Sequence, residues 1–297
     1  MSCDAHVHPY SLFKLDPGAE AVRRSLGIAA AASAWNREEF MFHRELAAAA
    51  EKDGAPPVFL CFAVHPQAPA GLSGRADETG WEETAAGRET QSPPETNGSG
   101  IIEDSLDALA EYAAAGELAA VGETGFDLFD ENFRQTEARQ EQLFAAHLET
   151  ALRYGLPLVI HVRRAMHKIF PYTPALKKLP AVVFHSWPGS PDEGFSLLRR
   201  GVNAFFSFGT TIMLNHKNAI RSCAAFAAER LLLETDAPFQ SPRGKSRSSW
   251  EDLPAILRAA AAIRASASGR SSSGFTPELE RITDSAFYRV FGNAKEK

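Results

Sequence analysis

Eight short apolar runs recur along the chain, and most of the stretches between them space their apolar residues as helices do. The predicted strands are Cys3–His8, Gly27–Ala34, Val58–His65, Leu118–Gly125, Leu156–Val162, Ala181–Ser186, Val202–Phe208 and Leu231–Asp236. Between the fourth and fifth runs, Leu143, His147 and Ala151 repeat at intervals of four, which indicates a helix with one buried face. Eight strands alternating with helices over 297 residues predict a single-domain (β/α)8 TIM-like barrel.

Two segments interrupt this alternation. Residues 68–100 are rich in Gly, Ser, Glu and Thr, with few apolar side chains to offset the entropy of ordering them, so we expect a flexible surface insertion after the third strand. Residues 265–274 are rich in Ser and Gly and predict a shorter flexible loop. Both lie inside the repeating pattern, so neither is expected to divide the chain into domains.

Composition excludes several classes of protein. A formal charge of −6 argues against a broad electrostatic grip on nucleic acid, although a substrate held locally by metal ions stays possible. No apolar run approaches the roughly 18 residues of a membrane helix, and no secretion signal is visible, so we expect a cytoplasmic protein. The three cysteines are widely separated, and we interpret them as reduced, buried residues without a metal role.

Residues that can bind metal ions gather at the ends of the predicted strands. They are His6, His8, His65, Glu123, His161, His185 and Asp236. All lie toward the carboxyl end of a strand, the face on which barrel enzymes place their catalytic groups. Alternate residues of a strand share a face, so His6 and His8 are expected to reach one ion, with Asp4 orienting one of the two rings.

The residue types restrict the chemistry. Four of these histidines and the two carboxylates form a nitrogen and oxygen donor set that suits two divalent ions such as Zn²⁺, Mn²⁺ or Mg²⁺. A shared carboxylate can hold two ions about 3.5–4 Å apart, and such a pair acidifies water and stabilises both oxygens of a displacement. The predicted reaction class is therefore hydrolysis.

A series of motifs carries a family resemblance. They are Asp-Ala-His-Val-His, Val-His-Pro, Gly-Glu-Thr-Gly-Phe-Asp, Arg-Gln before a helix, Val-Ile-His, Phe-His-Ser, Phe-Ser-Phe-Gly, and Leu-Glu-Thr-Asp-Ala-Pro-Phe followed by Pro-Arg-Gly-Lys. In this order the set resembles the TatD family, metal-dependent deoxyribonucleases of the amidohydrolase superfamily. The resemblance extends from Asp4 to about Gly292, nearly the whole chain.

The resemblance also implies roles for individual residues. It implies that Glu123 bridges two ions. The other implied ligands are His6, His8 and Asp236 for one ion and His161 and His185 for the other. It further implies that Asp236 accepts a proton from the attacking water and that His65 lies near the scissile phosphate.

Three features depart from the family pattern. Arg164 occupies a position where the family usually has an acid, Ser186-Trp187-Pro188 replaces the usual residues after His185, and the insertion after His65 is long. We expect all three near the mouth of the pocket, where they would affect the choice of substrate while leaving the ligands intact.

Basic and aromatic residues follow the predicted strands and are candidates for substrate binding. Arg163, Arg164 and Arg243 are expected to hold a phosphate backbone. The aromatic residues that could stack on bases, if they do not pack in the core, are Phe126, Phe129, Trp187 and Phe239.

The leading hypothesis is a two-metal phosphodiesterase, most simply a 3′–5′ exonuclease acting on single-stranded DNA ends. The alternatives are a metal-dependent ester or amide hydrolase, such as an aminoacyl-tRNA deacylase or a small-molecule amidohydrolase, and a metal-binding scaffold without catalysis. A phosphoesterase of the polymerase-and-histidinol type would end in an Asp-x-His pair, whereas this chain has Asp236-Ala237-Pro238. We expect neither a membrane association nor an obligate protein partner.

Overall fold

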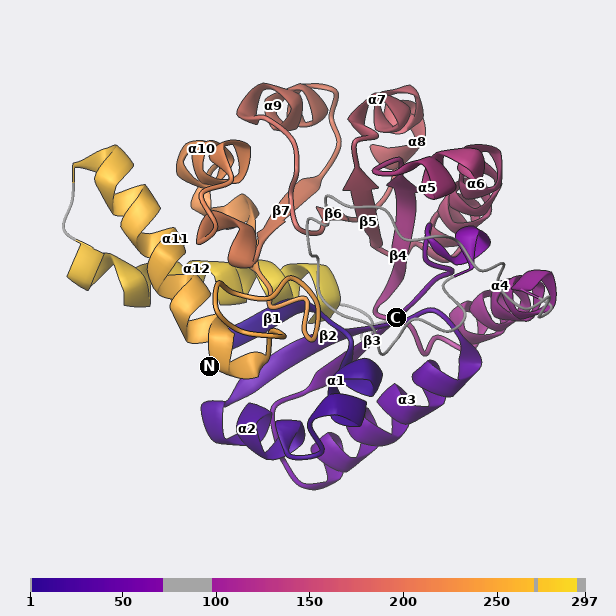
Figure 1. The fold of residues 1–297 in the computed structure, drawn as a ribbon, viewed down its shortest axis with the longest axis horizontal. Coiled ribbons are helices and arrows are strands. Elements are labelled where there is room, and N and C mark those ends of the chain that lie inside the picture. Colours follow the sequence, from indigo (N-terminus) through magenta and orange to yellow (C-terminus); the bar gives the residue numbers. More distant parts are fainter. Residues whose placement is uncertain (1, 72–97, 270–271, 293–297) are drawn as a thin grey trace.

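The computed structural model describes residues 2–71, 98–269 and 272–292. Its eight strands form one sheet, in which they follow one another in the same order as in the sequence (Figure 1). The strands are β1 (Ser2–Val7), β2 (Ile28–Ala34), β3 (Val58–Phe62), β4 (Ala120–Asp127), β5 (Leu158–Arg163), β6 (Val182–Phe184), β7 (Ala204–Phe208) and β8 (Leu231–Leu233). Each strand pairs in parallel with the next one along the chain.

The sheet curls into a nearly closed barrel because the end of β1 also meets the segment that follows β8. The Asp236 amide donates to the His6 carbonyl at 2.9 Å, and the His8 amide donates to the Ala237 carbonyl at 2.9 Å. The predicted (β/α)8 fold is confirmed, and these two bonds join the first and last predicted site residues at one edge of the barrel.

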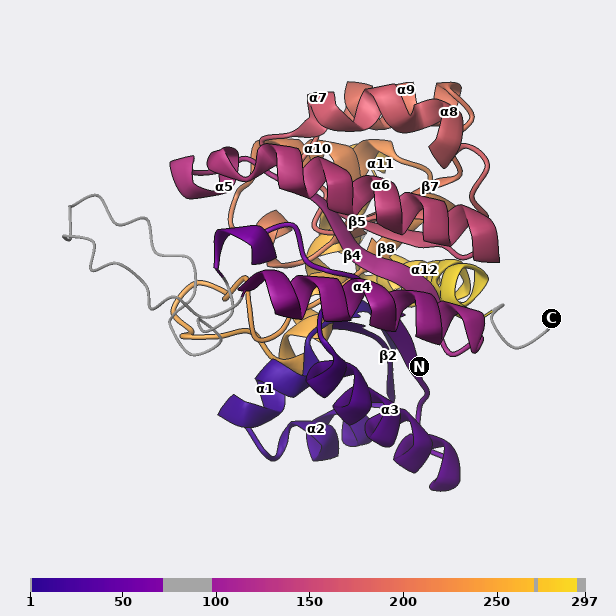
Figure 2. The same ribbon diagram turned by 90° about the vertical axis from the view of Figure 1, so that its right-hand side faces the viewer.

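Helices surround the strands (Figure 2). The α-helices are α1 (Pro9–Leu15), α2 (Ala19–Leu26), α3 (Arg37–Lys52), α4 (Gly98–Ala114), α5 (Glu131–Gln135), α6 (Glu137–Tyr154), α7 (Met166–Ile169), α8 (Thr173–Leu176), α9 (Pro191–Arg199), α10 (Lys217–Ala225), α11 (Leu253–Ser268) and α12 (Ser272–Phe291). Short 3₁₀ turns are η1 (Ala68–Ala70), η2 (Phe170–Tyr172), η3 (Thr210–Ile212), η4 (Ala228–Arg230) and η5 (Trp250–Asp252).

Local sequence signals explain where several helices begin and end. α3 begins after Asn36, whose side chain accepts a hydrogen bond from the Glu39 amide. α9 begins after Ser190 with a reciprocal capping box to Glu193. α6 ends at Gly155, whose left-handed φ of 63° suits a residue without a Cβ atom.

The last helix closes the amino end of the barrel. One face of α12, which is yellow in Figure 1, packs in a buried apolar cluster with side chains of the strands. The cluster takes alternate residues from β1 and β2 and one or two side chains from each of the other strands. From α12 this cluster includes Phe287 and Phe291, which are almost completely buried. The amino end is therefore filled by core packing, and the carboxyl end is left for polar side chains.

Two sequence predictions about loops are wrong in their boundaries. The predicted loop 265–274 is largely helical, because α11 continues through Ser268 and α12 begins at Ser272; residues 270 and 271 lie outside the described residues. The Ser268 hydroxyl donates to the Arg264 carbonyl at 2.9 Å, so this serine finds its partner inside the helix. Gly269, with a φ of 67°, then ends α11.

The predicted insertion 68–100 is also narrower than expected. Residues 68–70 form η1, and α4 begins at Gly98, inside the predicted insertion. The remainder of the predicted insertion, residues 72–97, lies outside the described residues.

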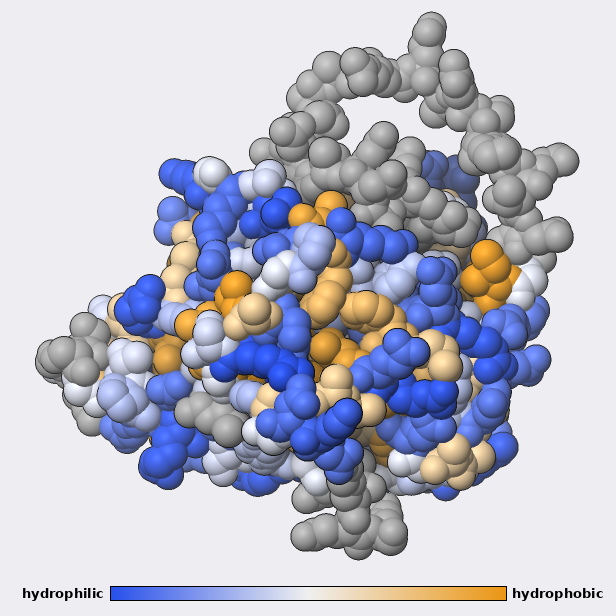
Figure 3. Space-filling model, turned by 90° about the horizontal axis from the view of Figure 1, so that it is seen from below, coloured by the Kyte–Doolittle hydropathy of each residue, from blue (hydrophilic) through white to orange (hydrophobic). Residues whose placement is uncertain are grey.

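The face formed by α1, α2 and α3 is mainly hydrophilic (Figure 3). Each of these helices exposes one large apolar side chain: Leu15 in α1, Leu26 in α2 and Met41 in α3. Isolated apolar side chains of this kind are ordinary on a protein surface. Within the described ranges, no helix combines the length and apolar character that crossing a membrane requires.

Candidate metal centre

Six of the seven predicted metal-capable residues lie in or beyond the carboxyl half of their strands, and Glu123 is the fourth of the eight residues of β4. His6 and His161 lie within β1 and β5, and His185 directly follows β6. The others are His8 at the start of α1, His65 in the turn after β3, Glu123 within β4, and Asp236 in the segment after β8. The strand β4 continues to Asp127, so Glu123 lies deeper in the barrel than the predicted strand end at Gly125 implies.

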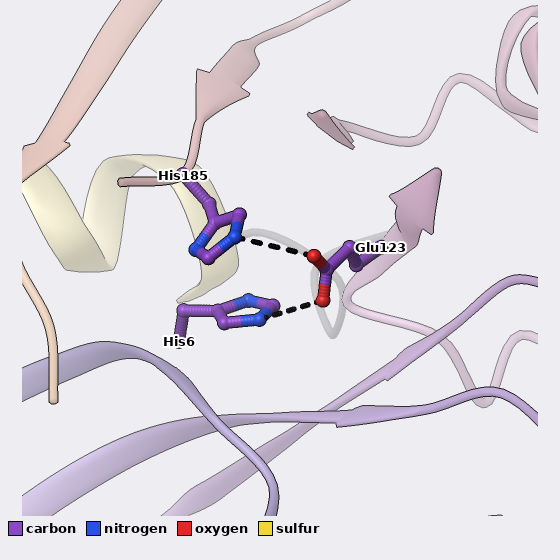
Figure 4. A group of neighbouring side chains, drawn as sticks. All are labelled: His6, Glu123 and His185. Atoms are coloured by element: carbon purple, nitrogen blue, oxygen red, sulfur yellow. Dashed lines mark ion pairs between the residues drawn. The ribbon is translucent and has the colours of Figure 1, made fainter. Parts of the chain in front are cut away.

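Glu123 is the centre of the arrangement, and Figure 4 shows two of its imidazole neighbours. Its Oε1 lies 2.7 Å from His161 Nδ1, 3.2 Å from His185 Nε2 and 3.2 Å from His65 Nε2. Its Oε2 lies 2.8 Å from His6 Nε2 and 3.5 Å from His8 Nε2. A single buried carboxylate therefore faces five imidazole rings.

Asp236 completes a second group on the β1 side. Its Oδ1 lies 3.7 Å from His6 Nε2 and 3.4 Å from His8 Nε2, and these two nitrogens are 3.1 Å apart. The Gln240 amide nitrogen donates to Asp236 Oδ2 at 2.7 Å, which fixes the carboxylate and leaves Oδ1 toward the histidines.

The electrostatics keep the central carboxylates ionised. Burial alone would raise the pKa of Glu123, but the imidazoles of His185, His6 and His65 outweigh it and hold that pKa well below its usual range. Burial likewise opposes ionisation of Asp236, and its hydrogen bond to His8 and the neighbouring imidazoles lower its pKa.

The donor set fits divalent cations. Three groups of potential ligand atoms lie within 4.8 Å of one another: His6–Glu123–His185, His6–His8–Asp236 and His65–Glu123–His161. Glu123 Oε2 is buried and lies 2.8 Å from His6 Nε2, but it forms no hydrogen bond with any of the described residues, so a cation could satisfy this oxygen. The three cysteines are buried, as expected, and none of them belongs to these groups.

A small cavity opens beside these groups. Its volume is about 20 Å³, and it is lined by His8, Ser33, Ala34, Trp35, Ala63, His65 and Glu123. That space is enough for about one water molecule. A larger hollow of about 410 Å³ between α10, α11 and α12 is lined by none of the predicted site residues.

Asp4 differs from its expected role. Its carboxylate accepts hydrogen bonds from the Thr235 amide at 2.9 Å and hydroxyl at 2.6 Å, and from the His6 amide at 3.3 Å. It therefore ties β1 to the segment after β8 instead of orienting an imidazole ring.

Two buried carboxylates escaped the sequence analysis. Asp127 Oδ2 lies 3.2 Å from His161 Nε2, and Glu234 Oε1 lies 3.2 Å from His185 Nδ1. The sequence contains a signal for both residues. Asp127 is four residues after Glu123 and Glu234 is two residues before Asp236, and in an extended strand residues at such even spacings lie on the same face.

The predicted substrate arginines lie at the rim. The guanidinium groups of Arg163 and Arg164 are 3.7 and 4.4 Å from the centroid of the Phe129 ring, and Arg163 also lies 3.7 Å from Asp127 Oδ2. Burial lowers the pKa of Arg163 to about 10, so it stays charged at neutral pH. Arg243 is exposed in the segment after β8.

The aromatic candidates divide between core and rim. Phe126 and Trp187 are buried in the apolar core, so neither can stack on a base. The prediction that Trp187 lies at the mouth of the pocket is therefore wrong. Phe239 is half-buried and meets the His8 ring edge-to-face, whereas 38% of Phe129 is exposed. Ser186, the first residue of the departing motif, donates to the side chain of Gln240 at 2.9 Å.

A parallel barrel with buried imidazoles around one carboxylate defines a class of (β/α)8 proteins whose clustered nitrogen and oxygen atoms could bind divalent cations. The family described as TatD related DNase matches residues 3–292. The chain therefore belongs to the TatD family, as the motifs predict.

Relatives and solved structures agree with this assignment. The chain is similar to proteins named 3′-5′ ssDNA/RNA exonuclease TatD from Dickeya dadantii (36% identity; 56% of this chain and 65% of the relative) and Escherichia coli K12 (32%; 51% and 60%). Both matches span less than two thirds of the relative. In fold it resembles the TatD homolog YJJV of E. coli K12 (TM-score 0.70, 21% identity, 98% of each chain). It also resembles a TatD family hydrolase from Entamoeba histolytica (TM-score 0.66, 15% identity, 98% of this chain and 97% of that one).

Proposed function

We propose that this protein is a metal-dependent phosphodiesterase that removes nucleotides from the 3′ end of single-stranded DNA in the cytoplasm. The proposal rests on one observation: two sets of histidine side chains face the two oxygens of the same carboxylate, Glu123, inside the barrel. Polarity and substrate are supported by the names of the relatives from Dickeya and Escherichia.

The residues divide between two ions through Glu123. His6, His8 and Asp236 would hold one divalent ion with Glu123 Oε2, since their atoms face that oxygen or one another. His161 and His185 would hold the other with Oε1. When bound, such ions supply Lewis-acid stabilisation of charged oxygens and lower the pKa of water. Zn²⁺, Mn²⁺ and Mg²⁺ are the candidates.

His65 is assigned a different role by its hydrogen bonds. The Gln67 amide donates to His65 Nδ1 at 3.1 Å, so the neutral ring carries its proton on Nε2. His65 Nε2 therefore faces Glu123 and the small cavity as a hydrogen-bond donor. It does so although it is close enough to Glu123 and His161 to share a cation with them. A protonated nitrogen cannot coordinate a cation, but it can donate to an oxygen of the scissile phosphate.

Asp236 is suited to accept a proton. Its hydrogen bond to His8 and the neighbouring imidazoles keep Asp236 ionised and so able to take up a proton, and Gln240 occupies only one of its oxygens. The other oxygen faces His6 and His8 across the same space, close to the cavity that can hold a water molecule.

The arginines at the rim would bind the substrate beyond the cleaved bond. Arg163 and Arg164 pack against Phe129, which holds two guanidinium groups side by side above Asp127 and β5. Together with Arg243 in the segment after β8, they offer positive charge to a phosphate backbone, although the net charge of the chain is −6.

One assay tests the proposal. Metal-depleted protein is supplied with Mg²⁺, Mn²⁺ or Zn²⁺ and incubated with end-labelled single- and double-stranded DNA, RNA, an aminoacyl-tRNA and phosphomonoesters. Metal-dependent shortening of single-stranded DNA from its 3′ end is expected. Asp236→Asn should abolish it, and Asp284→Asn, a carboxylate near Cys3 at the amino end, should not.

The same panel contains the contrary results. Hydrolysis of the ester substrates without cleavage of nucleic acid would replace the proposal with an ester or amide hydrolase. Metal binding without any hydrolysis would favour a scaffold. No feature of the site favours either alternative over the nuclease.

A further inference from the structure

Asp236 belongs to a short chain of hydrogen-bonded side chains at the carboxyl end of the barrel. Gln240 donates through Nε2 to Asp236 Oδ2 at 2.7 Å. The Ser186 hydroxyl lies 2.7 Å from the same Nε2 and 2.9 Å from Gln240 Oε1. Ser186 and Gln240 are both partly exposed. Their contact joins the segment after β6 to the segment after β8.

The backbone of these three residues adopts an unusual conformation. Ser186, Gln240 and Asp236 have left-handed φ angles of 46°, 51° and 52°. Residues other than glycine seldom adopt this region, and those that do are held there by the surrounding structure, often at functional sites. Among the described residues, only Arg164 and Asn215 share this conformation without being glycine. Backbone strain is therefore concentrated on the hydrogen-bonded chain that ends at Asp236.

Both ends of the hydrogen bond between Gln240 and Asp236 are anchored in the barrel. The hydroxyl of Thr210, a completely buried residue in η3 after β7, donates to the Gln240 carbonyl at 2.6 Å. The Asp236 amide donates to the His6 carbonyl in β1 at 2.9 Å, and the Asp236 carbonyl accepts from the Phe239 amide at 2.7 Å. The amide of the Gln240 side chain therefore acts on the carboxylate from a fixed position.

The Asp236 carboxylate needs such a contact because its last torsion angle has no sharp preference. Rotation between a tetrahedral carbon and a carboxylate is broad, so the rotamer alone does not fix the plane of the two oxygens. With Oδ2 bound to Gln240, Oδ1 lies 3.4 Å from His8 Nε2 and 3.7 Å from His6 Nε2. An amide donor carries no charge, so it orients the carboxylate without neutralising it.

We propose that Gln240, supported by Ser186, is a positioning residue that turns Asp236 Oδ1 toward its ion. That ion is the one proposed for His6, His8 and Asp236, so the inference rests on the proposed function for its existence. Groups that orient a metal ligand commonly contribute about 10- to 100-fold to metal affinity. Loss of the Gln240 contact should weaken one ion and not both, because Asp236 is a proposed ligand of that ion alone.

The first experiment measures Zn²⁺ binding to metal-depleted protein by competition with a chromophoric chelator. Wild type should bind two ions per chain. Gln240→Leu, which keeps a side chain of similar size but removes the donor, should weaken one ion about tenfold and leave the other unchanged. Gln142→Leu, the same substitution on the exposed face of α6, is the matched control. Unchanged affinity for both ions in Gln240→Leu, or an equal loss for both, would overturn the proposal.

A double-mutant cycle identifies the ion that is affected. The variant with His6→Ala and His8→Ala lacks the ion of Asp236, so adding Gln240→Leu should not change its affinity for the remaining ion. In His161→Ala, where the other site is impaired, Gln240→Leu should still cause a loss of about tenfold. A loss of that size in the first background would show that Gln240 acts on the other ion and would overturn the proposal.

Kinetics and melting temperature separate this role from substrate binding and from folding. At saturating metal, Gln240→Leu should lower kcat on DNA with little change in KM, and the metal-free variant should melt within a few degrees of wild type. A higher KM with unchanged kcat and unchanged metal affinity would make Gln240 a substrate contact instead. If Gln240→Leu does not fold, Gln240→Asn, whose amide is one methylene shorter, must show the weaker ion.

The outcome for wild type separates this inference from the proposed function. Wild type that binds two Zn²⁺ ions but hydrolyses no substrate would refute the proposed function and leave the role of Gln240 standing. Wild type that binds no divalent ion would refute both. A nuclease with two ions whose affinities are the same in Gln240→Leu would refute this inference alone.

Discussion

Replacing His147 should flatten the dependence of stability on pH. His147 lies on the buried face of α6, accepts a hydrogen bond from the Val64 amide on Nε2 at 3.2 Å, and contacts the Thr124 hydroxyl through Nδ1 at 2.5 Å. The Val64 bond requires an unprotonated Nε2. Burial accordingly lowers the pKa of His147 to about 3.

The magnitude follows from the difference between the folded and unfolded states. An unfolded histidine titrates near pH 6.5, so below that pH the unfolded chain binds a proton that folded His147 refuses. The contribution of His147 to the free energy of unfolding is therefore complete above pH 6.5 and is lost as the pH falls toward 3. Between pH 7.5 and 5.5 the loss is about 1.4 kcal/mol.

The assay is urea unfolding of chelator-treated protein at pH 7.5, 6.5 and 5.5. His147→Gln should be less stable at pH 7.5 by about 1–3 kcal/mol, because its hydrogen bonds are imperfectly replaced. From pH 7.5 to 5.5 it should lose about 1.4 kcal/mol less than wild type. His43→Gln should behave alike, since burial also lowers the pKa of His43 to about 3. A wild-type slope in His147→Gln would refute the reasoning.

Other changes should give equally definite results. Glu123→Gln should weaken both ions in a metal titration, because it removes a charge that two groups share; unchanged metal content would contradict the bridge. His65→Ala should lower the rate of DNA cleavage but keep two ions per chain by elemental analysis. Neutralising Arg163 and Arg164 should raise KM on DNA and reduce its log–log salt slope by roughly 0.7 per lost contact, with little effect on bis-p-nitrophenyl phosphate; equal losses on both substrates would point to a small-molecule hydrolase. Replacing residues 72–97 with a short Gly-Ser linker should shift the melting temperature by only a few degrees, since loop closure costs about 0.6 kcal/mol per doubling of length.

The barrel could be predicted because its strands are apolar runs whose period differs from that of the helices between them. Residue chemistry also pointed to His6, His161 and Asp236, since side chains at the carboxyl ends of parallel strands converge. The local spacing of residues did not reveal which acid faces which ring. Glu234 appeared as one polar residue beside an apolar run, and only the curvature of the barrel brings it to the outer nitrogen of His185.

Composition alone gives a wrong prediction where polar side chains form hydrogen bonds within their own helix or inside the core. The Ser-rich stretch after Arg264 was predicted as a loop, yet serine is tolerated at the end of α11 because its hydroxyl bonds to the preceding turn. Trp187 was placed at the pocket mouth by its proximity in sequence to His185. Its ring turns into the core instead, where its indole N–H donates to the Ser222 hydroxyl at 3.0 Å.

The packing of α12 beneath the barrel has a consequence for biosynthesis. The Ser2 hydroxyl donates to Glu280 at 2.6 Å, so the first strand meets the last helix across nearly the entire chain. Contacts of such long sequence separation form late and slowly. Until α12 has been synthesised, a nascent chain cannot cover the apolar amino ends of its strands, and apolar surface left exposed in this way favours aggregation.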